Sequence, residues 1–229
     1  MSQPQHEVVE KILHDPEFLK VISKRNAIAY SLTAIMLLCY FIFVVLLELT
    51  AWQALFDHGA LSAGQTVLIH GAGGGVGVYA VQLAHGAGAR VVATGRAWSR
   101  QLVTELGADE FIDLDQQPFE SAVDAVNLAL DLIGGDILRR TWAVVRPDGA
   151  LVSVVADPAT ASPEPHRARS VYFVVTPDRA ELVELAQRIE AGVLRPIVGG
   201  VAPLAEGRAA FEAKRSGGVA GKMALKVTD

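Results

Sequence analysis

Residues 66–94 read TVLIHGAGGGVGVYAVQLAHGAGARVVAT, and this stretch decides the fold. A β-branched run at residues 66–70 leads into a glycine-rich loop at residues 71–77, a helical pattern follows, and a second apolar run ends the stretch. A strand, a glycine loop, a helix and a second strand within about 30 residues form the βαβ unit in which a glycine fingerprint has structural meaning. The stretch therefore predicts a parallel α/β sheet, with a plain tight turn as the alternative interpretation of the glycines.

The glycine loop also predicts a binding site for the pyrophosphate of a dinucleotide. Glycines permit the tight turn and let backbone N–H groups approach the phosphates, while the N-terminus of the following helix stabilises their charge. The pattern is AxGxxG, with Ala72 in the first position and Gly74 and Gly77 in the others. The candidate phosphate-binding residues are Gly71, Gly74, Gly75, Val76 and Gly77.

Strands and helices continue to alternate after this unit. Further strands are expected at residues 110–114, within 122–132, at 150–155 and at 172–175, and helices at 101–106, 137–145 and 179–191. Because the connections are short, the pattern predicts a doubly wound parallel sheet of six strands within residues 50–229. Residues 157–169 contain three prolines and no periodic pattern, so a surface loop is expected there.

Composition excludes several classes of protein. The chain has 229 residues, a formal net charge of −5 and a mean hydropathy of +0.33. A chain without net positive charge is a poor candidate for binding nucleic acid. The single cysteine, Cys39, excludes an intrachain disulfide and a multi-cysteine zinc site. The six histidines show no HxxxH or HExxH spacing, so no metal site is expected.

Much of the hydropathy comes from residues 27–47, which read AIAYSLTAIMLLCYFIFVVLL and carry no charge. A helix of this length matches the hydrocarbon core of a bilayer, with a buried core helix as the alternative. Three basic residues within positions 20–25 precede the run, which predicts that this end stays in the cytoplasm. We therefore expect an amphipathic segment at 1–26, a transmembrane helix in contact with lipid at 27–49, and a nucleotide-binding domain at 50–229.

The end of the second strand distinguishes between the two nicotinamide dinucleotides. NAD-binding domains usually carry an acidic residue there, which accepts a hydrogen bond from the ribose 2′-hydroxyl. Here residues 94–100 read TGRAWSR, with two arginines and no acid. Arg96 or Arg100 can hold a 2′-phosphate, with Ser99 or Thr94 as a hydroxyl donor, so the expected cofactor is NADP(H). A solvated loop is the alternative interpretation of the two arginines.

The sequence assigns no catalytic acid or base. It contains neither a GxSxG nucleophile elbow nor a GxxxxGK[ST] phosphate loop. His70 stands at a strand end, where packing or capping is expected, and Asp131 precedes a glycine turn that it is expected to shape. Hydride transfer depends mainly on how a cofactor is positioned, so an oxidoreductase needs no such group.

Motifs along residues 50–227 carry a resemblance to a known family. Besides the glycine stretch they are LGADEFIDL (106–114), DLIGG (131–135), VVRPDGALVSV (144–154), FVVTPD (173–178) and GGVAGKMALKV (217–227). This part of the chain resembles the cofactor domain of the zinc-independent quinone oxidoreductases, within the medium-chain dehydrogenase/reductase superfamily. The resemblance implies a six-stranded Rossmann sheet and the NADPH-dependent reduction of quinones, enones or related activated alkenes. It also implies that Leu132, Val155, Phe173 and Val175 line the ribose and nicotinamide side. Many members carry an aromatic residue on adenine where this chain has Leu114.

Family members begin with a GroES-like catalytic domain that supplies most of the substrate pocket, whereas 49 residues precede Thr50 here. This chain is therefore expected to reduce quinones poorly by itself, and a homo-oligomer or a partner chain is the expected source of the other domain. A non-catalytic, membrane-anchored fragment or interaction protein is the alternative.

Residues 14–26 read HDPEFLKVISKRN, and with the apolar run after them they resemble the start of a small bacterial inner-membrane family of unknown function (DUF485). This resemblance implies a location at the bacterial inner membrane. The cofactor domain is expected in the cytoplasm, where NADPH is found, and the whole chain is expected there if the helix does not insert. The charge bias taken alone places residues after a single span on the opposite side.

Overall fold

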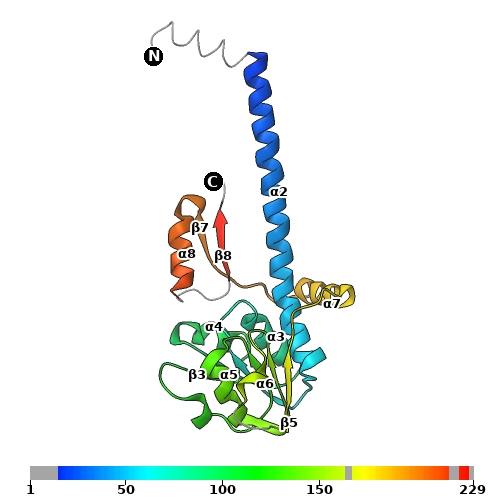
Figure 1. Cartoon of the computed structure of the whole chain (residues 1–229), viewed down its shortest axis with the longest axis vertical. Helices are drawn as coiled ribbons and strands as arrows, with labels where there is room; N and C mark the ends of the chain where they lie inside the picture. Colours follow the sequence, from blue (N-terminus) through cyan, green and yellow to red (C-terminus); the bar gives the residue numbers. More distant parts are fainter. Residues whose placement is uncertain (1–14, 163–166, 217–221, 227–229) are drawn as a thin grey trace. The chain divides into compact units, whose positions relative to one another are not determined.

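The computed structural model describes residues 15–162, 167–216 and 222–226, without the side chains of residues 33–44, 214 and 222 (Figure 1). The chain divides into two units, residues 1–45 and residues 46–229.

The described part of the first unit is helical, because helix α2 (Pro16–Trp52) begins there. The Asp15 carboxylate caps this helix by accepting hydrogen bonds from the backbone N–H of Glu17 at 2.7 Å and of Phe18 at 3.3 Å. An aspartate at the N-cap followed by proline at the first helical position is a common way to start a helix. The DPEF segment therefore has a local structural role.

The predicted membrane span, residues 27–47, falls within α2. In the described part of the chain, no helix offers an apolar stretch of the length that a bilayer crossing requires. Residues 33–44, the middle of the predicted span, lie outside the described side chains. The last turns of α2, from Leu46 on, belong to the second unit, where Leu49 and Ala51 are fully buried. The core of that unit thus starts before Thr50, where the domain was predicted to begin.

The second unit is built on one parallel sheet of six strands, which confirms the predicted doubly wound α/β fold. The strands are β1 (Thr66–His70), β2 (Arg90–Gly95), β3 (Glu110–Asp113), β4 (Val126–Asp131), β5 (Val145–Ser153) and β6 (Arg169–Tyr172). They lie in the order β3-β2-β1-β4-β5-β6. The strand order reverses between β1 and β4, and ligands of such sheets bind at the carboxyl ends of the strands at this point.

Helices cover both faces of the sheet (Figure 1). They are α3 (Gly77–Gly86), α4 (Arg100–Glu105), α5 (Gly135–Thr141), α6 (Pro158–Ala161) and α7 (Arg179–Glu190), with short helical turns η1 (Gln53–His58), η2 (Ala97–Ser99), η3 (Phe119–Ser121) and η4 (Trp142–Val144). Two buried clusters result, since successive side chains of a strand point to opposite faces. Val67 and Ile69 of β1 join the cluster that contains α3, whereas Leu68 joins the one that contains Phe119 and Trp142.

Strand β6 lies three residues earlier than predicted. Its last residue, Tyr172, is the first residue of the predicted strand at 172–175. The prediction followed the apolar residues, but β6 is an edge strand that is held by its backbone, with Ala150 of β5 opposite Arg169. Of the apolar residues that follow β6, Phe173 is buried in the core, whereas Val174 is exposed. The predicted loop at 157–169 also contains the short helix α6.

Elements that the sequence did not predict follow α7. Strands β7 (Val198–Pro203) and β8 (Lys222–Lys226) form a second, two-stranded parallel sheet, and η5 (Leu204–Glu206) and α8 (Gly207–Arg215) lie between them in the chain. Val201 of β7 and Phe211 of α8 are both more than half exposed.

Candidate functional site

The glycine loop (residues 71–77) joins β1 to α3 at the carboxyl end of the sheet. Gly71 has a φ of +77°, a left-handed conformation that glycine adopts far more readily than other residues. A Cβ atom on Gly77 would lie 2.4 Å from the carbonyl oxygen of Gly71, and one on Gly73 would lie 2.4 Å from Cβ of Ser99. The loop therefore takes its shape because these positions carry no side chain.

Backbone hydrogen bonds fix the loop against the next strand. The N–H groups of Gly71 and Ala72 donate to the carbonyl oxygen of Thr94 at 3.2 and 3.1 Å, and the N–H of Gly74 donates to that of Gly71 at 2.9 Å. Val76, the N-cap residue of α3, offers no side-chain cap. Two N–H groups of the first turn have backbone acceptors, since that of Val78 donates to the carbonyl oxygen of Gly74 at 3.2 Å and that of Tyr79 to the carbonyl oxygen of Val76 at 3.1 Å. The positive end of the helix dipole still faces the loop. Such a helix start favours an anion.

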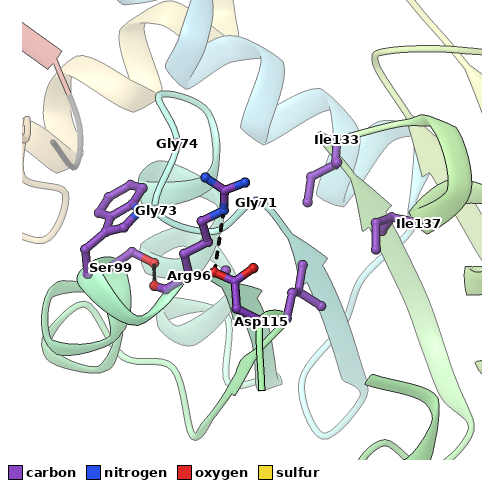
Figure 2. A pocket seen from close by; sticks show the side chains of 11 residues that line it. Gly71, Gly73, Gly74, Arg96, Ser99, Asp115, Ile133 and Ile137 are labelled. Atoms are coloured by element: carbon purple, nitrogen blue, oxygen red, sulfur yellow. Dashed lines mark hydrogen bonds and ion pairs between the residues drawn. The ribbon is translucent and has the colours of Figure 1, made fainter. Parts of the chain in front are cut away.

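A pocket of about 470 Å³ opens beside the glycine loop. Its lining residues come from the glycine loop, from the carboxyl ends of neighbouring strands and the segments that follow them, from η2 and from α5. They are Gly71, Gly73, Gly74, Gly95, Arg96, Trp98, Ser99, Leu114, Asp115, Ile133 and Ile137. Arg96 and Asp115 face each other on one side, and Ile133 and Ile137 lie on another (Figure 2). The pocket thus combines a glycine loop, a charged wall and an apolar wall.

Of the two arginines predicted to hold a phosphate, the structure brings only Arg96 into this pocket. Its Nε lies 3.7 Å from Oδ2 of Asp115, and its side chain is 62% exposed. The Arg100 guanidinium instead donates to the carbonyl oxygen of Phe111 at 3.1 Å and lies 4.7 Å from the centre of the Phe111 ring. Ser99 lines the pocket but is 1% exposed, and its hydroxyl donates to the carbonyl oxygen of Arg96.

Thr94, the other predicted hydroxyl donor, lies in the interior of the fold. The Thr141 hydroxyl donates to the carbonyl oxygen of Ile137 at 2.6 Å, so it accepts the proton of His70 Nε2 at 3.0 Å. His70 Nδ1 is then the acceptor for the Thr94 hydroxyl at 2.9 Å. In this arrangement the Thr94 hydroxyl donates to His70, and the role expected of Thr94 toward a phosphate stays a prediction.

His70 links the ends of β1 and β2 to α5 and has no access to solvent. Burial lowers its pKa to about 3, and the nearby charges of Glu120 and Arg140 act on that pKa in opposite directions. The ring stays neutral at physiological pH. Its packing role, expected from its position at a strand end, fits these contacts.

Asp131 organises the loop that carries Ile133. Its carboxylate accepts hydrogen bonds from the backbone N–H of Ile133 at 3.2 Å and of Gly134 at 2.9 Å, and from the Ser153 hydroxyl at 2.8 Å. Asp131 is completely buried. The residue thus shapes the turn after β4, as its place before two glycines suggested.

The residues expected on the ribose and nicotinamide side do not line the described pocket. Leu132 and Val175 pack partly buried against the core, and Phe173 is buried with its ring 4.3 Å from that of His58. Val155 is 46% exposed. Of the predicted phosphate-binding residues, Gly71 and Gly74 line the pocket, while Gly75, Val76 and Gly77 lead into α3.

Sequence reasoning missed six lining residues, namely the glycines Gly73 and Gly95 and four residues with larger side chains, Trp98, Asp115, Ile133 and Ile137. Asp115 follows β3, and its position opposite Arg96 depends on β2 and β3 being neighbours in the sheet. The only available signal was its place just after a strand. Where the structure describes the chain, no three His, Cys, Asp or Glu side chains gather as a metal site requires.

The family model and the similar proteins described below all point to the same family of oxidoreductases. A family model described as zinc-binding dehydrogenase matches residues 106–225. A probable mitochondrial zinc-binding oxidoreductase of Arthroderma benhamiae is 30% identical over 201 residues, covering 80% of this chain and 61% of the relative. A mitochondrial NAD(P)H oxidoreductase of Danio rerio is 28% identical, covering 79% and 54%. The structure of the quinone oxidoreductase from Coxiella burnetii has a TM-score of 0.72 and 29% identity, covering 79% of this chain and 58% of that one.

The chain therefore spans little more than half the length of these relatives. The matches lend no support to the resemblance of residues 1–48 to an inner-membrane family, and that resemblance stays a prediction.

Proposed function

This chain belongs to the zinc-binding dehydrogenase family, and from that premise we propose that its pocket binds NADP(H) for the reduction of a quinone or an enone. The bound dinucleotide would supply the hydride. The residues of this chain would bind the dinucleotide, orient it and distinguish NADPH from NADH. We infer each of these roles from the geometry of the pocket.

The observation that carries the proposal is the approach of α3 to the glycine loop. Because Gly71, Gly73 and Gly77 have no Cβ atoms, the loop can pack tightly against its own backbone and against Ser99, and a tight glycine loop of this kind lets backbone N–H groups approach a pyrophosphate. The start of α3, which has no side-chain cap, adds the positive end of a helix dipole at the same place. A glycine loop at the start of a helix fits two linked phosphates.

The walls of the pocket fit the adenosine half of the cofactor. Ile133, Ile137 and Leu114 form an apolar surface, and Trp98 adds an aromatic ring, which together suit a flat base. Arg96 follows β2, the position from which Rossmann domains contact the ribose 2′ group. Its guanidinium supports a preference for the 2′-phosphate of NADPH.

The quinone or enone substrate is inferred from the family. The similar structure from Coxiella burnetii is described as a quinone oxidoreductase, and the Danio rerio relative as an NAD(P)H oxidoreductase. Of the described residues that line the pocket, Asp115 alone has a carboxylate, and it is paired with Arg96, so the proposal assigns it no role in proton transfer and depends on positioning a hydride donor.

The test is a titration of the full-length chain with NADPH and NADH, followed by calorimetry and by thermal unfolding. We expect both to bind, NADPH more tightly, and at 100 times its dissociation constant to stabilise the fold by about 2.7 kcal/mol. Arg96→Ala is expected to weaken NADPH binding about tenfold and to leave NADH binding nearly unchanged.

Arg146→Ala is the matched control, because Arg146 also pairs with an exposed aspartate at 3.7 Å but lies outside the pocket. No binding of either dinucleotide would refute the proposed function. Equal losses for both dinucleotides in Arg96→Ala would refute the role of the arginine in phosphate recognition.

A further inference from the structure

A carboxylate and a guanidinium share the charged wall of the pocket. Asp115 Oδ2 and Arg96 Nε are 3.7 Å apart, and both side chains are 62% exposed (Figure 2). Of the described residues that line the pocket, Arg96 alone brings a positive charge and Asp115 alone a negative one. The charged wall is therefore neutral overall, which is unusual for a surface that is to prefer a phosphate.

The backbone holds Asp115 in this position. Strands β2 and β3 pair in parallel with Gly95 opposite Asp113, so their exits lie side by side. The N–H of Leu114 donates to the carbonyl oxygen of Gly95 at 3.0 Å. The N–H of Asp115 donates to Oδ1 of Asp113 at 3.1 Å, and Asp113 is itself buried. The carboxylate of Asp115 is thus presented to Arg96 by the sheet and by a fixed turn.

We propose that Asp115 is a specificity-determining residue that limits the preference for NADPH and lets the same pocket accept NADH. This inference rests on the proposed function. With NADPH, the Arg96 guanidinium has to be shared between two anions, and the Asp115 carboxylate repels the phosphate. With NADH, the carboxylate accepts a hydrogen bond from a ribose hydroxyl, as the acidic residue of NAD-binding domains does.

The expected change in dinucleotide affinity is small because the side chains of Asp115 and Arg96 are both exposed to solvent. Charges in contact with water interact weakly and are screened by salt, so the carboxylate changes affinity by about tenfold rather than by several orders of magnitude. This limit also explains why Arg96 and Asp115 can coexist in one site, since neither charge dominates the other.

The experiment compares dissociation constants of NADPH and NADH for the full-length wild type and for Asp115→Asn, by calorimetry at 50 and 500 mM salt. We expect Asp115→Asn to raise the preference for NADPH over NADH about tenfold at low salt, with a smaller change at high salt. Asp148→Asn is the control, because Asp148 pairs with Arg146 at the same 3.7 Å, is more exposed and lies outside the pocket. Asparagine keeps the size of the side chain, and circular dichroism of each variant checks the fold.

If both dinucleotides bind and their ratio is the same in Asp115→Asn as in the wild type, the role of Asp115 is refuted while the proposed function stands. If neither binds the wild type, the proposed function fails, and this inference fails with it. A rise in the ratio that is equal in Asp148→Asn would assign the effect to net charge and overturn the inference as well.

Discussion

Two loops border the pocket and differ in what they present to it: the glycine loop (residues 71–77) presents backbone, and the arginine loop (residues 95–99) presents side chains. In the glycine loop the backbone packs so closely that an added Cβ on Gly77 would lie 2.4 Å from a carbonyl oxygen. In the arginine loop, the side chain that matters, that of Arg96, is mostly exposed and has one long ion pair. In the proposed function, the first loop admits a dinucleotide and the second distinguishes NADPH from NADH.

The largest expected effect comes from breaking the glycine loop. In Gly77→Ala the methyl group meets backbone atoms that cannot move without shifting α3, so unfolding should become easier by about 3 kcal/mol. Gly86→Ala, at the other end of the same helix, is the control because its Cβ would meet no atom within 4 Å. This second variant should be neutral or up to about 1 kcal/mol more stable. Urea unfolding measures both, and equal stabilities would contradict the close approach.

The next largest expected effect is a pH dependence of stability that comes from His70. This residue joins the two strands that lead into the loops. Its pKa is about 3 in the folded protein, because of burial, against about 6.5 in the unfolded chain. Between these values the unfolded chain binds more protons, so stability falls as the pH falls. The expected loss from pH 7 to pH 5 is about 2 kcal/mol.

Urea unfolding at pH 7, 6 and 5 measures this slope, which should be absent from His70→Gln and retained in His85→Gln. Readings end at pH 5 because the hydrogen bond from Arg140 lowers the pKa of Glu120, whose contribution is lost only at more acidic pH. A slope that is as steep in His70→Gln as in the wild type would assign the pH dependence to other groups.

The smallest expected effect is a loss of dinucleotide affinity on substitution of Trp98, which lies in the arginine loop with Arg96. Trp98 lines the pocket but carries no charge, so Trp98→Ala should weaken NADPH and NADH equally, each by about threefold to tenfold. Trp98→Phe should restore most of the binding. Calorimetry with the two dinucleotides checks this, and a change in their ratio would show that discrimination does not come from charge alone.

The main sheet could be predicted because strands that are buried on both faces are continuous apolar runs, such as residues 66–70. Strand β6 was misplaced, since an edge strand depends on backbone pairing more than on apolar side chains. Strand β7 was missed because VGGVAP, with two glycines and a proline, has little strand propensity, and its structure depends on pairing with β8 about 20 residues later.

Only those parts of the site that depend on residues adjacent in the sequence could be predicted. The glycine loop and Arg96 could be identified because their chemistry follows from neighbours in the sequence. The roles of Arg100 and Thr94 could not, because each is determined by a distant partner: the carbonyl oxygen of Phe111 for one and the ring of His70 for the other. Asp115 became visible only when the sheet order placed it beside Arg96.

The burial of Leu49 and Ala51 in the core of the second unit bears on how this protein is divided for laboratory work. A recombinant fragment that begins at Thr50, the place suggested by sequence motifs, would lack a leucine side chain that is fully buried. A leucine of this kind contributes about 2–3 kcal/mol through burial alone, a large part of the net stability of an ordinary domain. The cloning boundary for the nucleotide-binding unit therefore belongs at Leu46 or earlier, within α2 and ahead of the first recognisable motif.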